Sequence, residues 1–129
     1  MHFTLEPNSG IPLGVQITRQ LRLAIVSGRL VPGERLPSAR ELAAELGVNF
    51  HTVRKAYGDL VQAGLLRFDR GMGTSVVDHV SVRAEDEVRP LVRQHMEQLL
   101  ADLAGFGLSS HQVVHLVAKE LKQLLKQEE

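Results

Sequence analysis

The feature that most constrains the fold is a pair of helix-start signals separated by a short turn. Ser38 to Glu41 reads S-A-R-E, a capping box in which the Ser and Glu side chains satisfy free amides of a helix start. Gly47 is placed to end that helix, and Asn49, two residues later, is a favoured cap for the next one. Two helices joined by so short a turn containing glycine form a helix-turn-helix.

The second helix of the pair has one apolar face. Five of its residues follow the i, i+3, i+4, i+7, i+8 spacing that places side chains on one side of a helix, so we expect them to face the core. Gly64 then ends the helix. The five residues are Val53, Ala56, Tyr57, Leu60 and Val61.

The other face of this helix begins with hydrogen-bond donors, namely His51, Thr52, Arg54 and Lys55. Such side chains match the major groove of DNA, where base edges present distinguishable donors and acceptors. The partial positive charge of a helix N-terminus also attracts phosphate. The alternative is an ordinary solvated face, because helix-turn-helix spacing also occurs in proteins that never touch DNA.

A β-hairpin is predicted directly after this helix. Residues 65–77 read LLRFDRGMGTSVV, in which Leu66 and Phe68 alternate before a tip with two glycines, Arg70 to Gly73. A hairpin in this place is a wing, whose glycines let the backbone approach the sugar-phosphate chain or the minor groove, with Arg70 as the cation. The alternative is a hairpin that only covers the edge of the core.

One more helix is predicted before the motif, over residues 13–27. Pro12 suits its start and Gly28 suits a left-handed cap at its end. Residues 29–37 contain a Pro-Gly turn and a second proline, which predict a short extended connection. The apolar stripe of the helix is Ile17, Leu21, Ala24 and Ile25.

Two further helices are predicted in the C-terminal part of the chain. The first spans residues 85–104, with Pro90 either in its first turn or disturbing the helix. A second capping box, Ser109 to Gln112, begins the last helix, which reaches about Lys126. Apolar residues cover more than one narrow stripe of these helices, so a second copy of the chain would complete a four-helix core. Such a hairpin offers little volume for an enclosed ligand pocket.

We therefore expect a mainly α-helical protein with one small β-hairpin, divided into two domains. Residues 1–78 would form a winged helix-turn-helix DNA-binding domain, and residues 79–129 a two-helix dimerisation region. A two-fold dimer would read a palindromic operator. Any small effector would bind at the dimer interface.

Composition and charge exclude several classes of function. The chain has no cysteine, which rules out disulfides, thiol nucleophiles and thiolate metal sites, and it lacks the common nucleotide-binding and hydrolase motifs. We expect no enzymatic activity and no cofactor. Without a signal peptide or a long apolar run, a cytoplasmic protein with no membrane contact is expected.

The charge distribution is nearly even along the chain. Residues 1–78 hold nine Lys/Arg against seven Asp/Glu, and residues 79–129 hold six against eight. DNA binding therefore needs a few well-placed cations, because a bulk basic surface is lacking.

His111 and His115 lie four residues apart and would share one helical face. They could hold a metal ion if His95, Glu97 or a partner chain supplied further ligands. Two ligands at this spacing are weak support, so no metal site is predicted, and the preferred interpretation is that they are polar residues on a solvated face or hydrogen-bonded at the interface.

Taken together, residues 11–77 resemble the winged helix-turn-helix domain of the GntR family of bacterial transcription regulators. The resemblance is carried by GRLVPGERLPSARELAAELGVNFHTVRKAYGDLVQAGLL and by RGMGTSVV. It implies that Arg40 and Arg54 contact the operator, that Thr52 contacts phosphate or base, and that Gly71 brings the wing tip to the minor groove. The short C-terminal region resembles that of the YtrA subfamily, which implies a homodimeric repressor.

Phe50 and His51 depart from the small polar or basic residues that many members carry there. Phe50 could pack on a thymine methyl or form a hydrophobic staple under the helix start, and His51 could donate to DNA or be solvated. The alternative function is a dimeric interaction or metal-sensing module whose winged helix contacts protein. The predicted DNA-binding residues are Ser38, Arg40, Asn49, Phe50, His51, Thr52, Arg54, Lys55, Arg70, Gly71 and Gly73.

Overall fold

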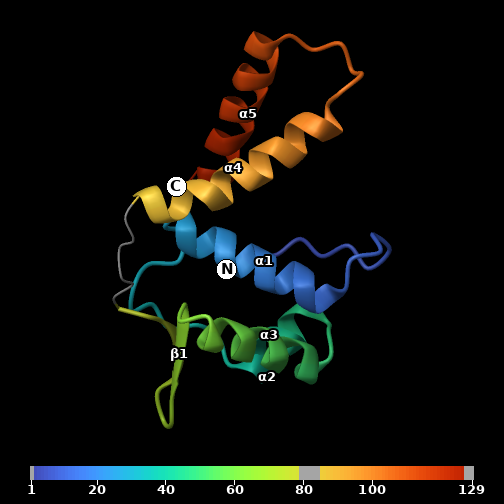
Figure 1. The fold of residues 1–129 in the computed structure, drawn as a ribbon. Coiled ribbons are helices and arrows are strands. Elements are labelled where there is room, and N and C mark those ends of the chain that lie inside the picture. Colours follow the sequence, from blue (N-terminus) through green and yellow to red (C-terminus); the bar gives the residue numbers. More distant parts are fainter. Residues whose placement is uncertain (1, 79–84, 127–129) are drawn as a thin grey trace. The chain divides into compact units, whose positions relative to one another are not determined.

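The computed structural model describes residues 2–78 and 85–126 of the chain (Figure 1). These residues form two compact units, one with the first three helices and both strands, the other with the last two helices. The boundary predicted between residues 78 and 79 stays a prediction, because residues 79–84 lie outside the described ranges. The elements are α1 (Leu13–Val26), α2 (Ala39–Leu46), α3 (Phe50–Gln62), β1 (Leu66–Asp69), β2 (Gly73–Val76), α4 (Glu85–Asp102) and α5 (Ser110–Leu125).

The ends of the helix-turn-helix are set by the caps that the sequence predicts. Both bonds of the Ser38–Glu41 capping box are present at the start of α2, and Gly47 ends the helix in the left-handed conformation at φ +69°. Asn49 caps α3 by accepting a hydrogen bond from the His51 N–H. The predicted mainly helical fold with one hairpin is therefore confirmed.

The core of the first unit lies where α1 and α2 pack on α3. Leu21, Val53 and Leu60 are completely buried, in agreement with the predicted apolar stripes. The assignment of Val61 to the core is wrong, because 38% of its surface is exposed. One residue advances a helix by about 100°, so Val61 turns away from Leu60 and lines a groove beside the hairpin.

The hairpin has a third backbone segment beside it. β1 and β2 pair antiparallel, with Leu66 opposite Val76, and on the other edge of β2 Arg35 forms a bridge with Ser75. The Leu36 N–H donates to the Thr74 carbonyl at 2.8 Å. The sequence predicted residues 29–37 only as an extended connection and missed this pairing. We call β1, β2 and residues 34–36 the wing.

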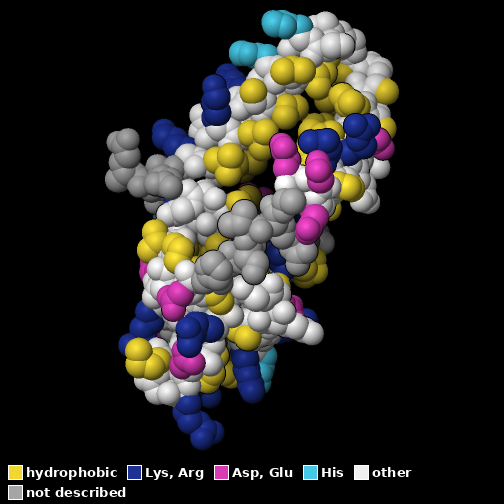
Figure 2. All heavy atoms as spheres, turned by 60° about the vertical axis from the view of Figure 1, so that its left-hand side comes forward, with side chains coloured by type: hydrophobic (Ala, Val, Ile, Leu, Met, Phe, Trp, Pro, Cys, Tyr) yellow, Lys and Arg dark blue, Asp and Glu magenta, His cyan; other side chains and the backbone are white. Residues whose placement is uncertain are grey.

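The second unit leaves its apolar residues on the surface. Neither α4 nor α5 buries a residue, and the two helices make few contacts with each other. The upper part of Figure 2 shows hydrophobic side chains gathered on the surface of this unit. Leu91 and Leu100 of α4 are more than half exposed, as is Val114 of α5. This unit therefore presents apolar surface that a partner could cover.

Local details of the second unit follow the predictions in part. Pro90 lies inside α4 beyond its first turn, and α4 ends at Asp102, two residues earlier than expected. The second capping box forms, with Ser109 N–H donating to Gln112 Oε1 at 2.8 Å and the reciprocal bond at 3.1 Å. None of the described helices combines the length and apolar character needed to cross a membrane.

Candidate nucleic-acid interface

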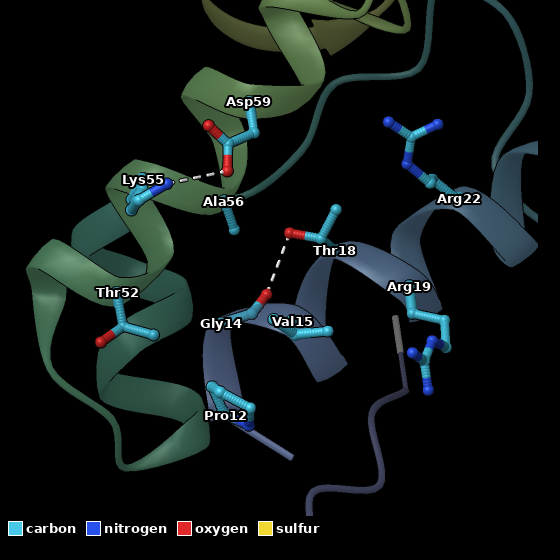
Figure 3. A pocket seen from close by; sticks show the side chains of 10 residues that line it. All are labelled: Pro12, Gly14, Val15, Thr18, Arg19, Arg22, Thr52, Lys55, Ala56 and Asp59. Carbon is cyan, nitrogen blue, oxygen red and sulfur yellow. Dashed lines mark hydrogen bonds and ion pairs between the residues drawn. The ribbon is translucent and has the colours of Figure 1, made fainter.

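Two grooves border α3. The wing groove lies between α2, α3 and the wing and has a volume of about 560 Å³. The α1–α3 groove has a volume of about 500 Å³ (Figure 3). Seven of the predicted DNA-binding residues line these grooves. They are Ser38, Arg40, Phe50, Arg54 and Gly73 in the wing groove, and Thr52 and Lys55 in the α1–α3 groove.

Arg40 places its guanidinium group on the ring of Phe50. The guanidinium carbon Cζ is 4.3 Å from the ring centroid, which makes this a cation–π contact. An arginine in this position could instead pair with Glu41 or Glu45, but neither ion pair forms in the described part of the chain. The N–H groups of Arg40 are therefore available to a ligand.

Glu41 is engaged in the cap of α2. Its carboxylate accepts a hydrogen bond from the Ser38 N–H at 3.2 Å, and its own N–H donates to Ser38 Oγ at 3.1 Å. These bonds, with a smaller contribution from the charge of Arg35, lower the pKa of the Glu41 carboxyl below its ordinary value. Ser38 Oγ acts as acceptor in this cap, so its hydroxyl proton can still be donated to a phosphate.

Tyr57 connects α3 to the chain that leads into α2. Its hydroxyl donates to the Pro37 carbonyl at 2.8 Å, and its side chain is buried in the core. Burial, and then the charges of Glu41 and Glu45, raise the pKa of the Tyr57 hydroxyl, which therefore stays protonated and keeps donating. The sequence predicted Tyr57 as a core residue but gave no sign of this bond, which fixes the start of α2 against α3.

Arg54 lies in the wing groove, one turn along α3 from Phe50. Arg54 could instead pair with a neighbouring acid, but no such ion pair occurs among the described residues. Two arginines, Arg40 and Arg54, thus line the wing groove, and neither is bound to a carboxylate of the described residues. Side chains that bind bases and phosphates need such free donors.

Thr52 and Lys55 reach the α1–α3 groove from α3 (Figure 3). Gly14 of α1 faces Thr52 there, since a Cβ added to Gly14 would make an ordinary van der Waals contact with the Thr52 methyl carbon, at 3.5 Å. Lys55 Nζ lies 3.2 Å from Asp59, and both side chains are at least half exposed. Exposed pairs of this kind contribute only about 0–1 kcal/mol, so a phosphate can compete for Lys55.

Arg19 and Arg22 also line the α1–α3 groove, and the sequence analysis missed them. They stand on α1 in Figure 3, and neither forms an ion pair within the described ranges. Their positions on the polar side of α1 could be predicted, but their placement in the same groove as Lys55 depends on how α1 packs on α3.

The wing tip combines open glycines with exposed cations. Gly71 has φ +87°, and a Cβ added there would meet no atom within 4 Å. Gly73 also has a positive φ, and its Cβ would lie 3.6 Å from the Arg35 guanidinium. The sequence did not indicate Arg35 as a DNA-binding candidate, because Arg35 comes to lie beside β2 only through the pairing of residues 34–36 with that strand. Arg70 is exposed at the tip and forms no ion pair in the described part of the protein.

Asn49, Phe50 and His51 form the start of α3. The Asn49 side chain accepts a hydrogen bond from the His51 N–H at 2.8 Å, so its oxygen serves the cap. Phe50 is half-buried against the core, and its ring centroid is 5.2 Å from that of His51. The His51 side chain is exposed. A DNA contact by any of these three residues stays a prediction.

The two histidines of α5 lie on its exposed surface. His111 and His115 are not joined by a third potential ligand anywhere in the described ranges. The preferred interpretation of these histidines as surface residues is unchanged.

Known proteins match both the winged unit and the whole chain. The sequence profile of the family described as "Bacterial regulatory proteins, gntR family" matches residues 13–76. The HTH-type transcriptional repressor YtrA of Bacillus subtilis (strain 168) is 30% identical over 92% of this chain and 93% of its own length. The chain belongs to the GntR family. Because the match to YtrA spans nearly the whole chain, the predicted YtrA-like branch of this family is also confirmed.

Solved structures of other proteins also resemble this GntR protein. The crystal structure of a transcriptional antiterminator from Listeria monocytogenes EGD-e covers 100% of this chain and 96% of its own, with a TM-score of 0.83 and 25% identity. The crystal structure of AraR(DBD) in complex with operator ORX1 covers 60% of this chain and 100% of its own, with a TM-score of 0.52 and 35% identity. YtrA and these structures are described as regulators or a DNA-binding domain, and none as an enzyme.

Proposed function

We propose that this GntR-family regulator binds operator DNA with the first turns of α3 in the major groove and the wing at the adjacent minor groove. The observation that carries the proposal is the pair Arg40 and Arg54, which line one groove beside α3 and have no carboxylate partner among the described residues. A guanidinium group can donate two hydrogen bonds to O6 and N7 of guanine, which is the commonest specific contact in protein–DNA complexes.

Four other predicted residues fit contacts to the DNA backbone or to the minor groove. Thr52 and Lys55 on the α1–α3 groove would bind phosphates, which fixes the position of the helix without reading sequence. Arg70 and the open backbone at Gly71 would approach the minor groove. A complex of AraR(DBD) with its operator is a relevant precedent, because that structure corresponds to 60% of this chain.

The regulator acts as a homodimer on a palindromic operator in this proposal. The exposed apolar residues of α4 and α5 are the surface through which two copies would associate. A two-fold dimer doubles the contacts of a chain whose net charge is zero. Repression in the cytoplasm is the proposed outcome, because a dimer on an operator excludes other proteins from the same DNA.

A small effector would bind in the second unit, where two copies meet. An open groove of about 660 Å³ lies near the loop between α4 and α5, lined by Leu103, Leu108 and Val113 among others. The sequence predicted little volume for an enclosed pocket in this region, and this groove is open to solvent. Ligand sites in proteins commonly have volumes of several hundred cubic ångströms.

Selection of bound duplexes from a random library, followed by titration at two salt concentrations, tests the proposal. We expect an enriched sequence whose affinity falls steeply with salt, with about one unit of logarithmic slope for each phosphate contacted. A protein that enriches no duplex would contradict DNA binding and would favour a role in protein contact for the same surfaces.

A further inference from the structure

The contact between Arg40 and Phe50 joins the first turns of two different helices. Arg40 follows the cap of α2, whereas Phe50 is the first residue of α3. The 4.3 Å distance from Cζ to the ring centroid therefore depends on how the two helices are set against each other. The Tyr57–Pro37 hydrogen bond and the buried core residues fix that arrangement.

The position of Arg40 is electrostatically unfavourable without the ring. A cation in the first turn of a helix meets the positive end of the helix dipole. Glu41, the next residue in the sequence, uses its carboxylate in the cap and forms no ion pair with Arg40. A free arginine side chain also samples many rotamers, which must be restricted before it can bind a base. The negative face of the Phe50 ring attracts the guanidinium group, which offsets the unfavourable helix dipole. The same contact restricts the rotamers of Arg40 before DNA binds.

Stacking leaves the hydrogen-bonding edge of Arg40 unused. A guanidinium group is planar, and its five N–H donors point outward in that plane, whereas the ring contacts its face. Guanine accepts with O6 and N7 at the edge of the base, so one arginine can stack on a ring and bind guanine at once. A carboxylate partner would instead occupy the same donors as the base.

We propose that Phe50 is the residue that positions Arg40 for base recognition by holding the guanidinium group through its face. The proposal rests on the proposed DNA-binding function and gives Phe50 a role other than direct contact with DNA. Phe50 is itself held in place, because one side of the side chain packs on the core and the His51 ring lies 5.2 Å away. It is a positioning residue that acts through Arg40.

NMR of the free protein tests the positioning without DNA. Protons on a side chain above an aromatic ring are shifted upfield by the ring current, so we expect such a shift for the δ-methylene protons of Arg40 in the full-length chain. Phe50→Tyr keeps the ring and should keep the shift, whereas Phe50→Leu should abolish it. Arg40 shifts that are the same in wild type and Phe50→Leu would overturn the proposal.

Fluorescence anisotropy on the selected operator tests the functional consequence. Phe50→Leu should weaken operator binding by about 3- to 30-fold, the range expected for a lost cation–π contact, while Phe50→Tyr should stay within about twofold of wild type. In the Arg40→Ala background, Phe50→Leu should cause no further loss. The guanine that Arg40 contacts can be replaced by 7-deazaguanine, which lacks N7. This replacement should lower the operator affinity of the wild type more than that of Phe50→Leu, and it should leave the affinity of Arg40→Ala unchanged.

The outcomes separate the possible failures. If Phe50→Leu weakens binding equally with and without Arg40, the ring acts on DNA directly and the positioning role is wrong. If the wild type binds no duplex, the proposed function fails, while the NMR comparison still decides whether the ring orders Arg40. Thermal denaturation controls for folding, and Phe50→Met, whose flexible apolar side chain adapts to irregular gaps but has no ring, replaces Phe50→Leu in both assays if that variant unfolds.

Discussion

At the scale of single residues, arginines divide into paired and unpaired groups. Arg67 of β1 and Arg89 of α4 both form ion pairs with nearby acids. Arg40, Arg54 and Arg70 form none within the described residues, and all three lie on the proposed DNA surface. A chain with zero net charge can therefore still present free cations where DNA would bind.

Replacing Arg40 by Ala should lower affinity for the selected operator by about 1–3 kcal/mol, the usual contribution of a good arginine–guanine contact. The melting temperature should change little, because Arg40 is exposed and forms no ion pair with any described residue. Arg89→Ala is the matched control, since it removes an exposed arginine that is paired on α4. Equal operator affinities of Arg40→Ala and wild type would show that Arg40 is an ordinary surface charge with no part in DNA binding.

The cap at Glu41 should make stability depend on pH in the acid range. The pKa of Glu41 is lowered in the folded protein, so its ionised form stabilises the fold above its unfolded pKa of about 4.3, and this contribution is lost as pH falls through the lower folded value. Gln at this position can cap but cannot ionise. Urea unfolding from pH 7 to pH 3 should show the wild type losing its advantage over Glu41→Gln, and a difference that stays constant would contradict this account.

At the scale of elements, the sequence predicts what depends on neighbouring residues and misses what depends on packing. The ends of α2 and α3 were predictable because Ser38, Gly47 and Asn49 act within a few residues of themselves. The pairing of residues 34–36 with β2 was not predictable, since it joins segments about forty residues apart. The Arg40–Phe50 contact was missed for the same reason, although both residues were named as candidates for DNA binding.

The hydrogen bond from Tyr57 should contribute to stability and to the geometry of the interface. Tyr57→Phe removes the donor and leaves the Pro37 carbonyl without it, which should lower the free energy of unfolding by about 0.5–1.5 kcal/mol. Operator affinity should fall as well, because the start of α2 is less firmly held. Urea denaturation measures the first effect and anisotropy the second, and a variant as stable as wild type would show that the bond is dispensable.

At the scale of the whole molecule, the proposed function needs both units. The winged unit supplies the reading surface, and α4 and α5 supply exposed apolar side chains of which none is buried within their own helix pair. A dimer follows from this division as a physical expectation, because large exposed apolar patches commonly mark protein contacts. The family match supports the regulator role independently of the oligomeric state.

A charge placed in the apolar surface of α4 should separate the subunits. Leu100 is 55% exposed, and Leu100→Glu would bury an unpaired charge in the dimer. We expect sedimentation to report a monomer and operator affinity to fall about tenfold or more, since the second half-site contact is lost. Gln94→Glu adds the same charge to an exposed polar position of α4 and should remain dimeric. A dimeric Leu100→Glu protein would place the interface elsewhere.

Protection of guanine N7 from methylation, measured along the selected operator with bound protein, tests the central claim most directly. We predict two clusters of protected guanines related by a two-fold axis, with their centres about 34–36 Å or a multiple of it apart, each losing its protection in Arg40→Ala. A single cluster without symmetry, or bound DNA whose guanines stay fully reactive, would contradict the claim that two copies each set α3 in the major groove.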